Sequence, residues 1–267
     1  MSTHHATPRE KVAVLHAGPL GLSRAIMLAC QHEVVIQDER STAVQMIRNG
    51  CAPTDDPEIQ RQLNQAARRL RATQDRREAL ADAYLVVITT PTSFSRWHRT
   101  VDTSDLDRAL RSVAQINPGA LVVIESTLPV GYTRAMAQQL RLPRLLAAPT
   151  RVRSERAFFD RQQAAALIVG GPSQACATYV ERWLNSPQAV PTPCLLTGSA
   201  EAEAIHLLHR KRELRGYDLS ATELAACAAQ HGLDMQQLME GLALMMSPAA
   251  APGGSSWHTA AQALAVS

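Results

Sequence analysis

Short, unbroken runs of aliphatic residues that end in hydroxyl- and proline-rich segments constrain this fold most. Residues 85–88 and 121–124 both read Leu-Val-Val-Ile, and segments rich in Thr, Ser and Pro follow them. Runs of this kind are typical of strands buried on both faces of a parallel sheet. Ligands of open α/β sheets bind just beyond the carboxyl ends of strands. We therefore expect a ligand site where these two strands end.

Strand-like and helix-like segments alternate along most of the chain. This repetition predicts an α/β fold with a Rossmann-like, doubly wound parallel sheet, followed by a short helical C-terminal region. The further strands are expected at 12–15, 33–36, 145–148 and 167–169. The helices are expected at 22–30, 42–48, 57–69, 106–115, 133–140, 173–184, 201–215, 221–231 and 235–245.

These segments predict four parts in the chain. A polar leader that we expect to be disordered covers residues 1–10, and the Rossmann-like domain covers 11–190. The proline-rich connector 187–193 marks the end of that domain. A helical central region follows at 191–246, and a loop-like tail with Pro and paired Gly covers 247–267.

Composition limits the classes of function. The 267 residues are 46% hydrophobic, enough for a full core, and the net charge is only +3. The arginine clusters lack interleaved aromatic residues, so we predict no nucleic-acid binding. The five cysteines have no metal-ligand spacing, so we predict no metal site. No window has the length and apolarity of a membrane span or of a signal region, so we expect a cytoplasmic protein without membrane association.

The turn after the first strand has part of a dinucleotide-binding fingerprint. His16 stands at the first glycine position, whereas Gly18 and Gly21 keep the second and third. A Cβ at the first position crowds the turn, and Pro19 removes one N–H from the phosphate cradle. Asp38 closes the second strand and is placed to accept hydrogen bonds from a ribose, which favours NAD. The alternative for Asp38 is a solvated acid at a strand end.

Several further motifs occur in order between about residue 11 and residue 170. They are Arg71-Ala72-Thr73, Ala81-Asp82-Ala83-Tyr84, Thr90-Pro91-Thr92, Asp102-Thr103-Ser104, Ile116-Asn117-Pro118, the segment 126–133 and Arg156-Ala157-Phe158-Phe159-Asp160. This collinear pattern resembles the bacterial UDP-glucose 6-dehydrogenases, within the wider nucleotide-sugar dehydrogenase family. The similarity continues more weakly to the C-terminus.

The resemblance implies NAD as cofactor and a nucleotide sugar of the UDP-glucose class as substrate. The family oxidises a sugar alcohol to a carboxylate in two hydride transfers, through a cysteine thioester. By resemblance, Thr92 and Thr127 border the cofactor. The alternative for both is a hydroxyl that only shapes a turn beside Pro91 or Pro129.

The chain departs from the family at most catalytic positions. Ser256 stands at the position of the cysteine, and a serine needs an adjacent base to act as a nucleophile. The bland alternative for Ser256 is a polar residue of the tail. Thr150 and Ser154 stand at two glutamate positions. Of the family's catalytic set, Thr127 alone is clearly retained.

Two further departures fall on the segment 201–215, which we expect to be helical. His206 stands at the family's lysine position and Arg210 at its asparagine position. Four residues apart, they share a helix face and could form a basic pair. The interpretation we favour here is that both face solvent on a helix that is polar nearly all round. Gly216 should weaken this helix, along which the family dimerises.

Three hypotheses follow. The first is an NAD-binding relative that is impaired or inactive in oxidising a nucleotide sugar to its uronic acid, that is, a pseudoenzyme. The second is an active NAD-dependent oxidoreductase that performs a single hydride transfer, or that a partner chain completes. Such a chain would supply the family's C-terminal UDP-binding domain, which we expect to be absent here. The third, a nucleic-acid or membrane module, fits the composition poorly.

Overall fold

The computed structural model describes residues 10–95, 100–150, 167–184, 193–216 and 218–246. Most of the predicted leader, the predicted tail and Ser256 lie outside these ranges. No helix in the described part has both the length and the apolarity that crossing a membrane requires.

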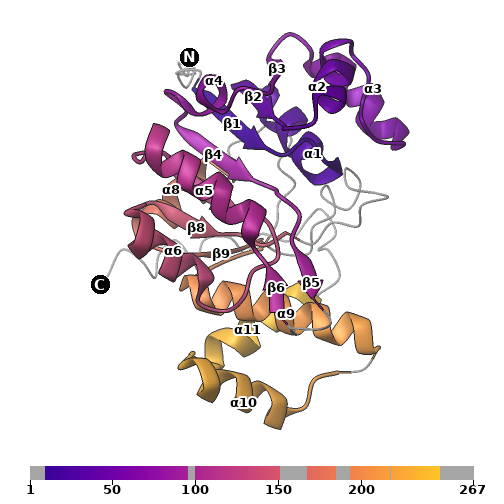
Figure 1. The fold of residues 1–267 in the computed structure, drawn as a ribbon. Helices are drawn as coiled ribbons and strands as arrows, with labels where there is room; N and C mark the ends of the chain where they lie inside the picture. Colours follow the sequence, from indigo (N-terminus) through magenta and orange to yellow (C-terminus); the bar gives the residue numbers. More distant parts are fainter. Residues whose placement is uncertain (1–9, 96–99, 151–166, 185–192, 217, 247–267) are drawn as a thin grey trace, which may run out of the picture.

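An eight-stranded sheet forms the centre of the molecule, in the order β10-β9-β8-β7-β4-β1-β2-β3 (Figure 1). Its strands are β1 Lys11–Leu15, β2 Glu33–Gln37, β3 Leu70–Thr73, β4 Leu85–Ile88, β7 Leu121–Ile124, β8 Leu145–Ala147, β9 Leu167–Gly170 and β10 Cys194–Thr197. All adjacent pairs are parallel except β8 and β9. The sheet confirms the predicted Rossmann-like fold class.

The helices that accompany this sheet agree with the predicted alternation except for the short α4, which was not predicted. They are α1 Pro19–Ala29, α2 Ser41–Arg48, α3 Pro57–Ala66, α4 Arg76–Leu80, α5 Ser104–Ile116, α6 Tyr132–Leu140, α8 Ser173–Leu184, α9 Ser199–Arg215, α10 Ala221–His231 and α11 Met235–Met246. Strands β5 Ser93–Ser95 and β6 Thr100–Asp102 pair antiparallel in a separate small sheet. In Figure 1, α9, α10 and α11 lie together at one end of the molecule.

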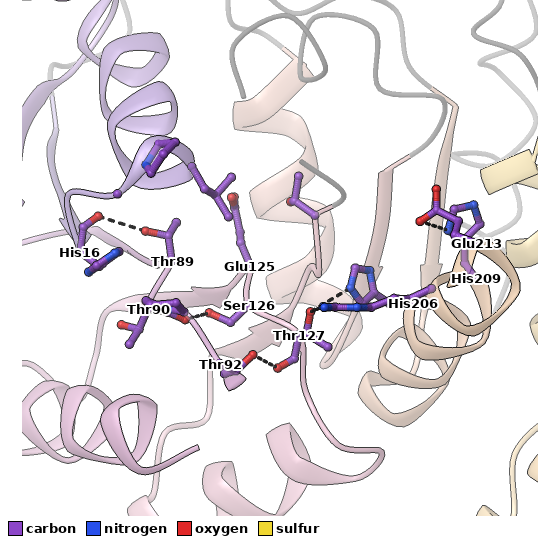
Figure 2. Close-up of a pocket in the computed structure, with 16 residues that line it drawn as sticks. His16, Thr89, Thr90, Thr92, Glu125, Ser126, Thr127, His206, His209 and Glu213 are labelled. Atoms are coloured by element: carbon purple, nitrogen blue, oxygen red, sulfur yellow. Dashed lines mark hydrogen bonds and ion pairs between the residues drawn. The ribbon is translucent and has the colours of Figure 1, made fainter. Parts of the chain in front are cut away.

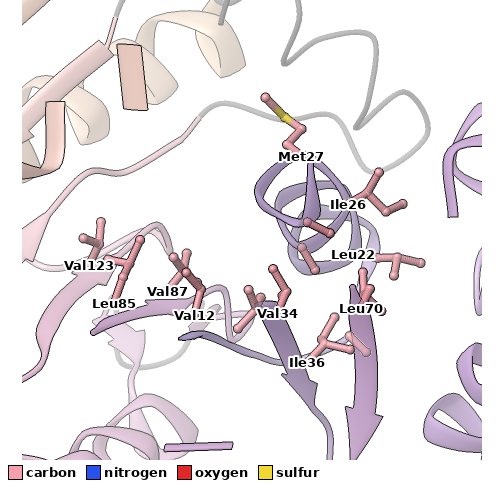
Figure 3. Close-up of a cluster of buried hydrophobic side chains, with 14 of the residues drawn as sticks. Val12, Leu22, Ile26, Met27, Val34, Ile36, Leu70, Leu85, Val87 and Val123 are labelled. Carbon is pink, nitrogen blue, oxygen red and sulfur yellow. The ribbon is translucent and has the colours of Figure 1, made fainter. Parts of the chain in front are cut away.

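Two hydrophobic clusters sandwich the sheet, as the aliphatic runs predict. On β4, Leu85 and Val87 belong to the cluster under α1 and α3, whereas Val86 and Ile88 belong to the cluster on the opposite face. Figure 3 shows the first cluster, in which Leu22 and other side chains of α1 lie over the strands. All four β4 residues are buried, so the strand has no solvent-facing side.

Strand β10 corrects the domain boundary expected at residue 190. It pairs in parallel register with β9 from Cys194 to Thr197, so the sheet extends past that boundary. The prolines of the connector were misleading, because a proline-rich segment can lead from a helix to the next strand of the same sheet as well as from one domain to another. Strand β3 was also missed, because Leu70-Arg71-Ala72-Thr73 has no aliphatic run.

Helix α9 is packed on the sheet, contrary to the expectation of a helix that is polar nearly all round. Its first half buries Ala202, Ala204 and Ile205 in the same cluster as Val86. Glu203 is fully buried as well, and its carboxylate accepts a hydrogen bond of 2.8 Å from the Thr133 N–H at the start of α6. This contact ties α9 to the start of α6. Gly216 does not interrupt α9 but ends it, with a φ of +72°.

Candidate functional site

A cavity of about 380 Å³ opens at the carboxyl ends of β1, β4 and β7 and is closed on one side by α9 (Figure 2). In the sheet, β1 lies between β2 and β4, so the strand order reverses beside β1, and the cavity lies at this reversal. Ligands of doubly wound sheets bind at such a point of reversal. The structure thus places the ends of the two Leu-Val-Val-Ile strands in one cavity, as the sequence predicted.

The turn after β1 combines two glycines with one strained residue. His16 has a φ of +82°, a conformation that glycine adopts without cost and other residues rarely adopt. A Cβ on Gly21 would lie 1.9 Å from the His16 carbonyl oxygen, so α1 approaches the strand only because residue 21 is glycine. Gly18 caps α1, and Pro19 occupies its first turn. The turn keeps the shape of a dinucleotide cradle.

Asp38 is buried beneath this turn, with only 3% of its surface exposed, which does not fit a solvated acid. Its Oδ2 accepts the Ala17 N–H at 2.7 Å, and the Arg40 side chain donates to both carboxylate oxygens at 2.9 Å. Burial acts to raise the pKa of Asp38, but the bonds from Arg40 and Ala17 outweigh it and lower that pKa to about 2. Asp38 is therefore ionised, and a ribose hydroxyl would share it with Arg40.

Hydroxyl groups join the two strand ends. The Thr92 hydroxyl donates to the Thr127 carbonyl at 2.9 Å, and the Ser126 hydroxyl donates to the Thr90 carbonyl at 2.6 Å. The Thr92 hydroxyl thus links two strand ends and does not bond within the turn beside Pro91, and Thr92 also lines the cavity. Thr127 differs, because its hydroxyl faces α9.

Thr127, His206 and Arg210 meet in the cavity, as Figure 2 shows for the two residues of this cluster that it labels. The Thr127 Oγ1 lies 3.2 Å from the His206 Nε2, and an Arg210 N–H donates to the same Oγ1 at 3.1 Å. His206 is only 8% exposed, so the favoured expectation of a solvent-facing histidine was wrong. Its shared face with Arg210 was the useful signal, and the burial of α9 on the sheet was the missing information.

Burial also sets the protonation state of His206. Desolvation, with smaller contributions from Arg210 and His209, lowers its pKa to about 4. The imidazole is therefore neutral at physiological pH and one ring nitrogen can accept a proton. The buried Nδ1 has no hydrogen-bond partner among the described residues. The cluster thus holds a neutral base, a hydroxyl and a guanidinium within one cavity.

A buried ion pair beneath the cavity was not predicted. The Arg24 guanidinium contacts the Glu125 carboxylate, and the Tyr179 hydroxyl donates to the same carboxylate at 3.3 Å. Both charged side chains are at most 2% exposed. An arginine among the apolar residues of α1 was the available signal, since a buried charge needs a partner. His209 and Glu213, 3.7 Å apart, line the far side of the cavity and were also missed.

The remaining predicted residues line the cavity, support the turn beside it or lie outside the described ranges. Thr150 lines the cavity, and its hydroxyl bonds to the Ala148 carbonyl at 3.2 Å. Gly21 and Asp38 support the turn without lining the cavity. Ser154 and Ser256 lie outside the described residues. Within the described ranges, no three His, Cys, Asp or Glu side chains gather so that they could hold a metal ion.

The residues present fit a dinucleotide: the helix approach at Gly21, the buried acid Asp38 and the cavity at the strand ends all match its needs. Gly18, Thr92 and Thr127 would hold it along the edge of the sheet, with the α1 N-terminus toward its phosphates.

Comparisons with known proteins place the chain among the nucleotide-sugar dehydrogenases. It is 26% identical over 234 residues to a UDP-glucose 6-dehydrogenase from Campylobacter jejuni, covering 87% of this chain and 59% of that protein. It is 33% identical over 246 residues to a UDP-N-acetyl-D-mannosamine dehydrogenase from Pyrococcus horikoshii, covering 86% and 56%. The chain thus spans less than two thirds of the length of these relatives.

Solved structures agree with these relationships. The UDP-D-ManNAc dehydrogenase from Pyrococcus horikoshii superposes with a TM-score of 0.66 at 30% identity, covering 91% of this chain and 60% of that one. The family profile for the NAD-binding domain of the UDP-glucose/GDP-mannose dehydrogenases matches residues 10–186. The chain therefore belongs to the UDP-glucose/GDP-mannose dehydrogenase family and carries its NAD-binding domain.

Proposed function

We propose that this chain binds NAD but does not by itself carry a nucleotide sugar to the uronic acid. The observation that supports this most is the absence of a thiol from the cavity. All five cysteines fall within the described residues, and none of them lines it. Burial raises the pKa of Cys176 and of Cys194 to about 12, so neither supplies a thiolate at neutral pH. A thioester pathway therefore has no nucleophile here.

Two measurements test this proposal together. Isothermal titration calorimetry should detect NAD binding, with millimolar affinity or better. Incubation with NAD and UDP-glucose, UDP-N-acetylmannosamine or GDP-mannose should yield no uronic acid by mass spectrometry. Formation of a uronic acid with two NADH per sugar would overturn the second half of the proposal. No detectable NAD binding would overturn the first.

A second candidate function is a single oxidation that stops at the carbonyl. The contact between Thr127, His206 and Arg210 favours it. Because the Arg210 guanidinium can only donate, the Thr127 Oγ1 accepts from it and can pass its own proton to the neutral His206 Nε2. Thr127 would then take the proton of a substrate hydroxyl, and Arg210 would stabilise the developing alkoxide. NAD, when bound, accepts the hydride from the carbinol carbon, which completes a two-electron oxidation.

This second candidate predicts a distinct stoichiometry. One NADH should form per sugar, and hydroxylamine should trap the carbonyl product as an oxime. His206→Ala should abolish NADH formation, whereas NAD binding measured by calorimetry should persist. If His206→Ala formed NADH at the parental rate, His206 would not be the proton acceptor of the reaction.

The nucleotide sugar and the cellular setting are part of the same proposal. The relatives named above act on UDP-glucose or UDP-N-acetyl-D-mannosamine by name, so a nucleotide sugar is the first substrate to test. A partner chain could supply the surface that binds the nucleotide moiety, and co-purification with tagged protein would reveal it. The five thiols are free, as is typical of the reducing cytosol, where we place the chain.

A further inference from the structure

The imidazole of His16 lies in the dinucleotide turn itself. A Cβ built on Gly18 would lie 2.7 Å from the His16 Nε2 and 2.9 Å from its Cδ2. That edge of the ring therefore covers Gly18, at the N-terminus of α1. His16 lines the cavity, and its side chain is 28% exposed (Figure 2). In a Rossmann fold, this is the place over which a dinucleotide diphosphate lies.

The turn has fewer backbone donors for a diphosphate than a glycine-rich turn offers. The Ala17 N–H is directed to Asp38 at 2.7 Å, and Pro19 has no N–H. The diphosphate of a dinucleotide carries two negative charges. Another donor at this position would replace part of what the backbone lacks.

Protonation decides what His16 offers to such an anion. Its Nδ1 lies 3.4 Å from the Asp38 Oδ2, so Asp38 favours a proton on Nδ1. The neutral ring then presents the Nε2 lone pair toward the turn, which an anion disfavours. The protonated ring presents an N–H in the same direction, which an anion favours.

Several charged groups face the ring. Asp38 lies beside it from the end of β2, with Arg40 next to that carboxylate, and Asp105 of α5 contributes from farther away. Burial lowers the pKa of His16 and Arg40 lowers it further, whereas Asp38 and Asp105 raise it. A bound diphosphate would raise it as well, so binding would be coupled to proton uptake.

We propose that His16 is a ligand of the dinucleotide diphosphate that binds it in the protonated form, so that cofactor affinity rises as pH falls. This inference rests on the proposed NAD binding. On this proposal, the histidine at the first glycine position of the fingerprint takes part in cofactor binding and is not only tolerated there.

Calorimetric titrations between pH 5.5 and pH 8.5 test the inference with NAD, ADP-ribose and adenosine as probes. A single charge-assisted hydrogen bond changes affinity by roughly tenfold to a hundredfold. NAD and ADP-ribose should therefore bind more tightly by about that factor at the acidic end, with at most one decade per pH unit. Adenosine, which lacks the diphosphate, should bind independently of pH over this range.

Two variants and one control separate the role of His16 from other effects. His16→Gln should bind NAD weakly and without pH dependence. His16→Gly restores the first glycine and should bind more weakly than the parent at pH 5.5. His231→Gln, at the exposed end of α10, should retain the parental pH dependence. The ring proton resonance of His16 should titrate at higher pH in the ADP-ribose complex than in the free protein.

A pH-independent affinity of the parent protein would overturn this inference and leave the NAD proposal intact. Tighter binding by His16→Gly at pH 5.5 would overturn it as well, because the ring would then obstruct the turn. An unshifted His16 resonance in the complex would have the same meaning. No binding of NAD or ADP-ribose at any pH would instead remove the proposed function and this inference with it.

Discussion

The neutral, buried imidazole of His206 makes a prediction about stability that does not depend on knowing the substrate. In the unfolded chain this histidine titrates near the ordinary histidine pKa of 6.5, whereas in the folded protein its pKa is lowered to about 4. Between these two values the unfolded state binds more protons than the folded state. Stability should therefore be lost as pH falls from about 6.5 to about 4, and His206 should have no effect on the slope above that range.

The size of this loss follows from the shift. Each pKa unit corresponds to about 1.4 kcal/mol, so full protonation of His206 should cost the folded state about 3 kcal/mol. That is a large share of the 5–15 kcal/mol that is typical of the stability of a domain, roughly a fifth or more. His206→Gln removes the titrating group and keeps a polar side chain beside the Thr127 hydroxyl.

Urea unfolding followed by circular dichroism, at several pH values from 4 to 8, measures this directly. The parent protein should lose about 3 kcal/mol more than His206→Gln over the acidic range. His231→Gln, which changes an exposed histidine, should follow the parent. Equal slopes for the parent and His206→Gln would refute the reasoning. The pKa of His206 would then be the same in the folded and unfolded states, and burial would not be what keeps the imidazole neutral.

Substitutions at Glu125, Arg24 and Gly21 test the scaffold of the site, and one at Gly232, at the end of α10, tests a position away from it. Glu125→Gln removes the carboxylate that contacts the buried Arg24 guanidinium and should lower the free energy of unfolding in urea by about 3–5 kcal/mol. The double variant Glu125→Gln/Arg24→Met leaves no buried charge and should regain part of that stability. Gly21→Ala places a Cβ 1.9 Å from the His16 carbonyl oxygen and should lower the free energy of unfolding by about 1–3 kcal/mol. It should also weaken NAD binding as measured by calorimetry, and an unchanged affinity would contradict the close approach of α1. Gly232→Ala, at a φ of +64°, should cost about 1 kcal/mol in thermal unfolding and leave NAD binding unchanged.

The fold could be predicted wherever sequence alone determines burial. The residues of β4 and β7 are aliphatic throughout because both of their faces are covered, and that pattern is readable without a structure. Strand β3 lies at the edge of the sheet and exposes Arg71, and its residues carry no comparable aliphatic pattern. Strand β10 follows a proline-rich segment, and only its pairing with β9 identifies it as part of the sheet.

Site residues whose spacing along the chain follows a motif could be predicted, whereas contacts between segments distant in the sequence could not. The glycines of the turn and Asp38 were predicted because a fingerprint fixes their spacing, and Thr92 and Thr127 were predicted from the resemblance to the family. The burial of His206 was not, because the charged run from Arg210 to Glu213 made the helix look polar and the contact of α9 with the sheet is a tertiary property. The Arg24–Glu125 pair likewise joins α1 to the end of β7, 101 positions apart, a distance over which spacing carries no information.

The position of each group in the fold accounts for which chemistry this chain can support. The groups that would hold a dinucleotide follow the carboxyl ends of β1, β2, β4 and β7, whose positions the core fixes. Of the groups that could act on a substrate within the described residues, Thr127 follows β7, whereas His206 and Arg210 stand on α9, which Glu203 ties to the start of α6. Because α9 is held against the sheet, a histidine at position 206 is forced into the cavity and is neutral there. A neutral imidazole beside a hydroxyl can move a proton but cannot form a thioester, which is why the second candidate function proposed above stops at the carbonyl.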